Sequence, residues 1–136
     1  MSRRSWTTRS AASAAVLAIA LSGCTVAADS RKAERAAELG CDEVPTAVAD
    51  AVEAALSDEF TLGEGSTGFE REGRWLVAAP LVDAEGITEN AAFAVDLAAR
   101  PAAVTAESGH AQKASTAPAG STAGAADVLD CVFSVS

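Results

Sequence analysis

Few residues of this chain have the type and spacing needed for covalent chemistry, and Cys24 is the most distinctive of them. It follows Leu21, Ser22 and Gly23 and comes at the end of a short apolar run, Ala11 to Leu21. A cysteine thiolate is a nucleophile, and the small residues before it would let a processing enzyme reach the sulfur. The pattern therefore predicts covalent modification of Cys24.

The residues before Cys24 have the layout of an export signal. Three arginines, Arg3, Arg4 and Arg9, precede the apolar run, and no acidic residue interrupts either part. The run has about eleven residues, whereas a membrane-spanning helix needs about twenty. We therefore expect export without a retained transmembrane helix. The stretch Ser2 to Trp6 also resembles a twin-arginine motif, so both the general and the twin-arginine routes stay open.

The tetrapeptide Leu21-Ser22-Gly23-Cys24 resembles the lipobox of bacterial lipoprotein precursors. This resemblance implies cleavage between Gly23 and Cys24, a diacylglycerol on the Cys24 sulfur, and acylation of the new amino terminus, for example by palmitate. The alternative is an ordinary secretory peptide that is cut nearby, for example after Ala28, with an incidental thiol. The lipobox interpretation predicts an anchor in the cell membrane that holds the protein at the extracytoplasmic face.

The two other cysteines, Cys41 and Cys131, form an even pair once Cys24 is modified. In an oxidising compartment we expect one disulfide between them, which would stabilise the fold by about 4 to 5 kcal/mol because it closes a long loop. The alternative is a metal site or a reactive thiol pair. It lacks partners, since His110 is the only histidine and the chain has no Cys-x-x-Cys. We expect neither a metal nor a cofactor.

The charge balance narrows the choice of partners. The whole chain has a net charge of −9, and residues 1–23 contain three of the ten basic residues and none of the nineteen acidic ones. Without that segment, seven basic residues face nineteen acidic ones, a net charge of −12. Such a charge opposes binding to nucleic acid and to anionic lipid. Membrane contact is therefore expected through acyl chains on Cys24.

Hydrophobic periodicity predicts one α+β domain over residues 41–136, after a signal peptide at 1–23 and a tether at 24–40. Apolar residues recur every three or four positions from Val44 to Glu59, which predicts an N-terminal amphipathic helix. Short runs separated by glycine then predict a small antiparallel sheet of about four strands, followed by short C-terminal helices. The strands are expected near 66–71, 74–81, 91–97 and 102–107, and the helices near 111–115 and 123–132.

Turn chemistry and alternation add detail to this sheet. Glu72-Gly73 is expected to turn the first hairpin. The larger side chains of the strands are expected to face the N-terminal helix. These side chains are Phe69, Trp75, Val77, Phe93, Val95, Leu97 and Val104.

Three apparent motifs do not amount to a catalytic or binding site. Residues 63–68 match G-x-G-x-x-G, but a helix precedes them and Glu64 would repel a phosphate, so we interpret them as a turn. Ser108 and His110 are too close in sequence for an obvious nucleophile and base. Asp83 and Glu85 lack the regular oxygen ligands of a calcium loop and are at most a weak cation site. We expect no catalytic residue and no enzymatic activity.

Four features of the sequence occur together: the lipobox, an expected helix that opens with Cys-x-x-x-Pro at residues 41–45, the run from Gly73 to Ala79, and a late cysteine in an acidic helix. In this combination the chain resembles a group of small uncharacterised actinobacterial lipoproteins. The resemblance implies an envelope location and no particular chemistry. We expect a lipid-anchored, non-enzymatic module that interacts with a protein or cell-wall partner. A small-ligand or cation-binding lipoprotein is the main alternative, and an envelope hydrolase is a further one.

Overall fold

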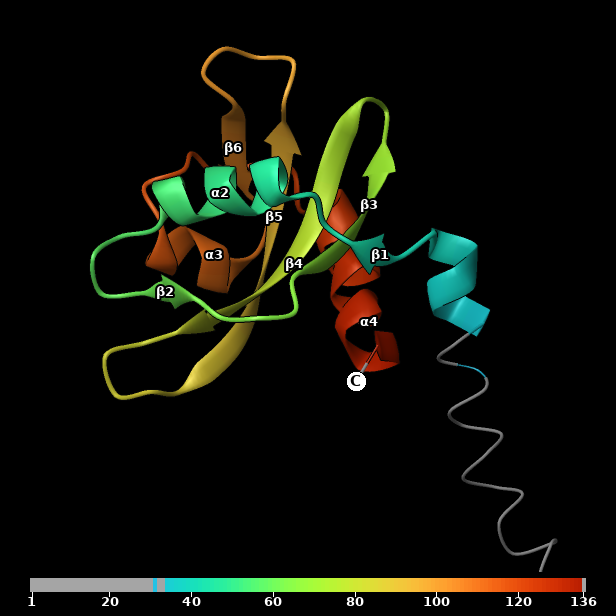
Figure 1. Cartoon of the computed structure of the whole chain (residues 1–136), viewed down its shortest axis with the longest axis horizontal. Helices are drawn as coiled ribbons and strands as arrows, with labels where there is room; N and C mark the ends of the chain where they lie inside the picture. Colours follow the sequence, from blue (N-terminus) through green and yellow to red (C-terminus); the bar gives the residue numbers. More distant parts are fainter. Residues whose placement is uncertain (1–30, 32–33, 136) are drawn as a thin grey trace, which may run out of the picture.

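The computed structural model describes residue 31 and residues 34–135. Cys24, the rest of the lipobox and the predicted signal peptide lie outside the described residues. Figure 1 shows a sheet that runs diagonally through the domain, with helices on either side. This arrangement confirms the predicted α+β class with an antiparallel sheet and short helices.

The sheet contains six strands, two more than the expected four. They are β1 (Asp42–Glu43), β2 (Thr61–Leu62), β3 (Thr67–Arg71), β4 (Arg74–Val82), β5 (Thr88–Asp96) and β6 (Ala103–Ala106). The order is β1-β3-β4-β5-β6, all neighbours are antiparallel, and β2 pairs with the far end of β4. The strands that were not expected, β1 and β2, have two residues each and are too short to show a period of two.

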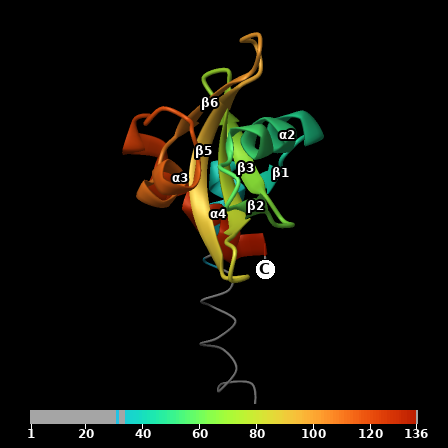
Figure 2. The ribbon, with the colours of Figure 1, turned by 90° about the vertical axis from the view of Figure 1, so that its left-hand side faces the viewer.

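Helices cover both faces of this sheet. They are α2 (Thr46–Ala55), α3 (Gly109–Ala114) and α4 (Ala125–Val135), with a short 3-10 turn, η1 (Thr122–Gly124), before α4. Figure 1 shows α2 and α3 on one side of the sheet and α4 on the other, and Figure 2 gives the side view, with α3 to the left and α2 to the right of the strands. The domain therefore has three layers and two separate apolar clusters.

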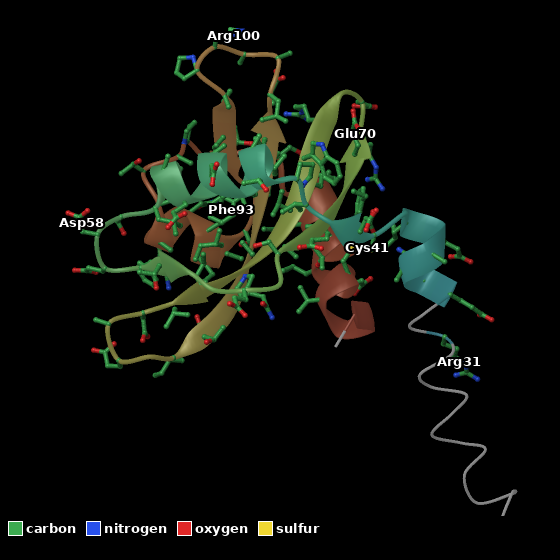
Figure 3. All side chains as sticks on the ribbon, viewed as in Figure 1. Arg31, Cys41, Asp58, Glu70, Phe93 and Arg100 are labelled. Atoms are coloured by element: carbon green, nitrogen blue, oxygen red, sulfur yellow. A yellow bond between two sulfur atoms is a disulfide. The ribbon has the colours of Figure 1, made fainter. Side chains whose placement is uncertain are left out.

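The larger cluster lies between the sheet and the α2 side. Val48 and Val52 are spaced one helical turn apart on α2, so both point the same way, and both are completely buried. They belong to one cluster with Val77 of β4 and with Phe93 of β5. Figure 3 shows Phe93 beside α2 in the middle of the domain.

A tertiary contact ends α2 at Ala55, although the apolar pattern continues to Glu59. Leu56 is extended and forms an isolated bridge with Ser115. Both the backbone N–H and the hydroxyl of Ser57 donate to the carbonyl oxygen of Ala114, at 2.9 and 3.0 Å. These bonds to the end of α3 replace the next turn of helix.

The smaller cluster lies between the sheet and α4, and it corrects two of the predicted side-chain orientations. Phe69 packs on the α4 side with Leu76 and Val128, not on the α2 side. Leu97 lies just beyond β5 and is 39% exposed. The predicted orientations followed from a sheet with helix packed on only one of its two faces. Because both faces are covered, Phe69 is buried on the face opposite to Val77 and Phe93.

Small residues let α4 lie close to the sheet. The side chains of Ala78, Ala92 and Ala94 face α4 and are almost completely buried.

The turn between β3 and β4 consists of Glu72 and Gly73. Both residues have positive φ angles, 54° and 78°, as the predicted tight turn requires. The hairpin therefore forms where the sequence predicts it.

The predicted disulfide is present between Cys41, which precedes β1, and Cys131 of α4, with the two Cα atoms 5.6 Å apart.

The segment before Cys41 is helical over residues 34–39. Gly40 has a φ of 73°, so this glycine ends the helical segment as expected. The segment contacts the domain, because Leu39 packs against the cluster beneath α4. Part of the predicted tether is thus docked on the domain.

Candidate ligand groove beside the disulfide

An interruption between β2 and β3 creates the most distinctive surface feature of the described residues. The Gly63 N–H donates to the carbonyl oxygen of Pro80 at 2.7 Å, and Thr67 then pairs with Ala78. Residues 64–66 therefore stand opposite the single residue 79. The extra residues must leave the plane of the sheet, and Gly65 supports this with a φ of 90°.

A groove of about 630 Å³ lies beside this bulge. Its walls come from the start of β1, from the bulge, from the middle of the sheet and from the last turn of α4. The lining residues are Cys41, Asp42, Glu43, Glu64, Gly65, Ser66, Thr67, Pro80, Asn90 and Val132. Figure 3 shows Cys41 next to β1 and near α4. The volume is within the range of small-ligand sites.

The charged residues that line the groove in the described part of the chain are all negative. Asp42, Glu43 and Glu64 contribute three carboxylates, and no described lysine, arginine or histidine lines the groove. None of the three carboxylates forms an ion pair with another described residue. Val132 belongs to the last turn of α4, and the C-terminal end of a helix has a partial negative charge. The groove therefore favours a positively charged group.

Two hydroxyl groups in the lining lack hydrogen-bond partners. Ser66 is 8% exposed and Thr67 is 5% exposed, and neither hydroxyl oxygen has a partner among the described residues. Buried polar atoms in proteins are usually paired, because leaving one unpaired costs about 1 to 3 kcal/mol. Register places Glu43 directly opposite Thr67 across the β1–β3 pair. Thr67 thus stands opposite Glu43 in the register, while its hydroxyl oxygen is closed off from solvent.

Ser108 and His110 are positioned by different partners. The Ser108 oxygen accepts from the Ala111 N–H at 3.2 Å, which caps α3, and from the Ala92 N–H at 3.0 Å, which holds α3 to β5. The His110 Nδ1 lies 2.9 Å from a carboxylate oxygen of Glu89, and its ring packs edge-on against Phe60. No hydrogen bond between described residues joins the Ser108 hydroxyl to the His110 ring.

The two other motifs have structural roles. Asp83 Oδ1 accepts from the backbone N–H groups of Glu85 and Ile87, both at 2.9 Å, and so closes the β4–β5 turn. Residues 63–66 link β2 to β3, and residues 67 and 68 already belong to β3, so the motif runs into a strand instead of the helix that a dinucleotide site requires. Within the described part of the chain, no three histidine, cysteine, aspartate or glutamate side chains are grouped to hold a metal ion.

Sequence reasoning missed the groove, although the glycines were a usable signal. Gly63 and Gly65 fall between two runs that pair with the same strand, β4, and Gly68 lies inside the second run. Glycine inside a strand pattern often marks a bulge. These residues favour a turn when only their local pattern is considered, and nothing in that pattern indicates that the chain continues along β4.

Comparison with protein-family models, curated proteins and solved structures finds no match to this chain. Among the residues that the structure describes, no helix has the length and apolar character needed to cross a membrane. The interpretation of the groove therefore depends on the residues that line it.

Proposed function

We propose that the protein is a lipid-anchored extracytoplasmic envelope protein and that its folded domain is a non-enzymatic interaction module. The observation that carries the proposal is the tetrapeptide Leu21-Ser22-Gly23-Cys24 at the end of an export-type apolar run. A diacylglycerol on Cys24 holds the protein at the cell membrane. The domain then presents its surface to a protein or cell-wall partner on the extracytoplasmic side.

The Cys41–Cys131 disulfide supports this location, because disulfides form and persist mainly in oxidising compartments outside the cytoplasm. Its position also suits a tethered domain. Cys41 lies where the chain enters the sheet, and Cys131 lies in α4. A pull on the amino-terminal segment would therefore be transmitted to the core through a covalent bond, and β1 would not peel away from β3.

The docked segment before Cys41 supports a short connection to the membrane. Arg35 forms ion pairs with Asp127 and Asp130 of α4, at 3.0 and 3.8 Å. The nine residues 25–33 can span at most about 30 Å when fully extended. The proposal thus places the domain, and the groove beside Cys41, close to the membrane surface.

Intact mass spectrometry on protein extracted from the producing cells tests the anchor. We expect a mass that corresponds to residues 24–136 plus diacylglycerol and any further acyl group, and partition into the membrane fraction. A Cys24→Ser variant should lose both the lipid mass and the membrane partition, whereas a Ser22→Ala variant, which keeps the thiol and a small neighbour, should retain them. An unlipidated wild-type protein, or a mature chain that starts elsewhere, would contradict the anchor.

A further inference from the structure

We propose that the Cys41–Cys131 disulfide is a redox-sensitive switch that controls the docking of the amino-terminal segment. Its reduction releases residues 34–43 from α4 and β3, while the rest of the domain stays folded. The reductant that the switch requires is a dithiol. The inference adds a form of regulation to the anchored module and so rests on the function proposed above.

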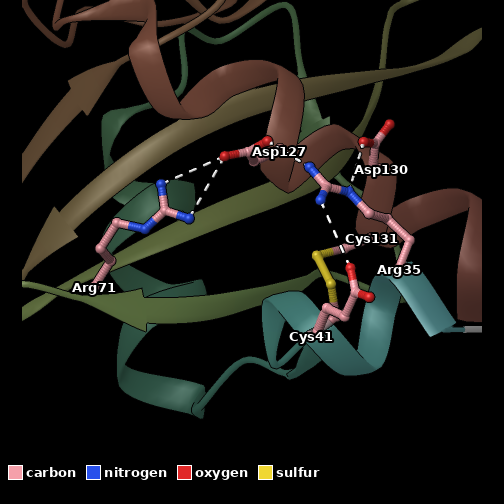
Figure 4. A network of polar contacts seen from close by, with 7 residues as sticks. Arg35, Cys41, Arg71, Asp127, Asp130 and Cys131 are labelled. Atoms are coloured by element: carbon pink, nitrogen blue, oxygen red, sulfur yellow. Dashed lines mark hydrogen bonds and ion pairs between the residues drawn. A yellow bond between two sulfur atoms is a disulfide. The ribbon is translucent and has the colours of Figure 1, made fainter.

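Apart from the disulfide, the contacts that hold the segment before β1 in the described part of the chain are weak. Most of residues 34–40 are exposed, and Leu39 is half-buried against the cluster beneath α4. Arg35 pairs with Asp127 and Asp130 beside the disulfide, as Figure 4 shows, but its side chain is 48% exposed. Ion pairs between exposed side chains contribute little to stability. The covalent bond is therefore the strongest attachment of this segment to α4.

Strand β1 adds little to the attachment. It consists of Asp42 and Glu43, which are both exposed and pair with Gly68 and Thr67 of β3. A two-residue strand at the edge of a sheet forms few backbone hydrogen bonds and buries little apolar surface, so it opens easily. We therefore expect β1 to separate from β3 once the disulfide no longer holds the preceding residue.

The release is expected to stop at Val44. This residue is buried and belongs to the larger cluster, together with Val48 and Phe93. Its N–H also donates to the carbonyl oxygen of Ser66 at 3.3 Å. Val44 therefore fixes the chain to the α2 side of the sheet without the help of the disulfide.

Helix α4 also has contacts of its own that do not depend on the segment. The buried residues of the smaller cluster all belong to β3, β4, β5 and α4. Val128, for example, is completely buried among them. Burial of apolar side chains is the main source of stability in a folded domain. Reduction of the disulfide is therefore expected to leave α4 packed on the sheet.

The two cysteines differ in how a reductant can reach them. Cys41 is half-buried and lines the groove of about 630 Å³, whereas Cys131 is completely buried. Thiol–disulfide exchange begins with the attack of a thiolate on one of the two sulfur atoms, and its rate depends on access to that atom. We therefore expect the attack at the Cys41 sulfur, from the side of the groove.

The exchange has two steps. A thiolate of the dithiol forms a bond to the Cys41 sulfur, the Cys41–Cys131 bond breaks, and the Cys131 sulfur leaves with the electron pair and takes up a proton. The second thiolate of the reductant then attacks the first reductant sulfur, and the Cys41 sulfur leaves and takes up a proton. The dithiol thus loses two electrons and two protons and becomes a disulfide, and both cysteines become thiols.

The consequence of release is a longer connection to the membrane. With the disulfide intact, residues 25–33 join Cys24 to the docked segment and span at most about 30 Å. After reduction, residues 25–43 join Cys24 to Val44 and span at most about 65 Å. The reduced protein could therefore reach a partner about twice as far from the membrane surface.

Hydrogen–deuterium exchange of the protein purified from the producing cells tests the release. One sample is treated with dithiothreitol, and a mass increase of two hydrogens confirms that its disulfide is reduced. Residues 34–43 should exchange at least tenfold faster in this sample, while β4 and β5 stay protected over the same labelling times. Unchanged exchange of residues 34–43 would overturn the inference. Equal loss of protection in β4 and β5 would also overturn it, because the whole domain would then unfold.

Two variants separate the disulfide from the ion pairs. Cys41→Ser removes the disulfide without a reductant and should give the same fast exchange of residues 34–43. Arg35→Gln is the matched control, because it removes the pairs with Asp127 and Asp130 but keeps the disulfide. It should leave the exchange of the segment within about twofold of the wild type. Equal acceleration in the two variants would overturn the disulfide as the switch.

Glutathione tests the site of attack, because a monothiol leaves a mixed disulfide on the cysteine that it attacks. Peptide mapping after an acid quench should find glutathione on Cys41. Glutathione mainly on Cys131 would overturn the inference, because this buried sulfur is reached only when the domain opens. Intact mass of the same preparation reports the lipid anchor independently. A lipidated protein without release therefore rejects only the switch, and an unlipidated protein with release rejects only the anchor.

Discussion

Arg35 and Asp127 form an ion pair of 3.0 Å that joins the segment before Cys41 to the first turn of α4. Figure 4 shows Asp127 between Arg35 and Arg71, close to the Cys41–Cys131 disulfide. The Arg71 guanidinium nitrogens lie 3.5 Å from the second carboxylate oxygen. One carboxylate therefore links three parts of the chain: the amino-terminal segment, β3 and α4.

The energetic value of this contact is expected to be modest. The Arg35 and Asp127 side chains are 48% and 31% exposed, and pairs of this kind contribute about 0 to 1 kcal/mol. Asp127→Asn removes both arginine pairs and a favourable charge at the helix start. We expect it to lower the free energy of unfolding by about 1 kcal/mol in urea titration. Glu38→Gln, whose pair with Arg35 is 3.9 Å long, is the control and should change it by less than about 0.5 kcal/mol. Equal effects of the two variants would contradict this role for Asp127.

Removal of the disulfide should have a larger effect. Replacing both Cys41 and Cys131 by serine is expected to lower the free energy of unfolding by about 2 to 5 kcal/mol, since the closed loop spans most of the domain. Urea unfolding with and without a thiol reductant measures this difference. Reductant should destabilise the wild type and leave the double variant unchanged. A wild type that is insensitive to reductant, with its disulfide shown to be reduced, would contradict the prediction.

Gly68 is required because β3 approaches β4 closely at this position. A Cβ atom here would collide with the backbone carbonyl of Leu76, which cannot move without disturbing the ladder. We expect Gly68→Ala to destabilise the protein by about 3 kcal/mol, at the upper end of overpacking effects. The control is Gly109→Ala, because a Cβ at Gly109 meets nothing within 4 Å. Circular dichroism during urea or thermal unfolding compares the two, and similar stability would show that the strands can separate locally.

The layer beneath α4 should tolerate little added volume. Ala92 is completely buried between β5 and α4, so Ala92→Leu is expected to cost about 1 to 3 kcal/mol through overpacking. Leu97→Ala changes an exposed side chain and should stay within about 0.5 kcal/mol of the wild type. Urea midpoints measure both, and a wild-type midpoint for Ala92→Leu would mean that α4 can shift without loss of stability.

Local chemistry made much of the sheet predictable. Val77 and Trp75 alternate along a run that begins after Glu72-Gly73, and this run is β4. Alternation and the turn depend on residues within a few positions of each other, so the sequence alone contains that information. The disulfide could also be predicted from the sequence, because Cys41 and Cys131 are the two cysteines that remain after Cys24 is assigned to the lipobox.

The candidate groove could not be predicted in the same way. It depends on β2 and β3 sharing β4, on β1 pairing with Thr67, and on Val132 of α4 lining the same groove as Pro80. Each of these contacts joins residues that are far apart in sequence, and β1 and β2 have no periodic pattern. Ser66 and Thr67 are ordinary strand residues in the sequence. Only the tertiary structure shows that neither hydroxyl oxygen has a hydrogen-bond partner in the described part of the chain.

The sequence by itself determined the elements whose signals are local: the strands around the Glu72-Gly73 turn, the capacity of Cys41 and Cys131 to pair, and the lipobox pattern at Cys24. Only the tertiary structure decided that Phe69 faces α4, that Ser108 caps α3 and fastens it to β5, and that Asp42, Glu43 and Glu64 line one groove with the disulfide-bonded Cys41. Periodicity and turn preferences act over a few residues. The partner of a buried group is chosen by packing between segments that the chain brings together from distant positions.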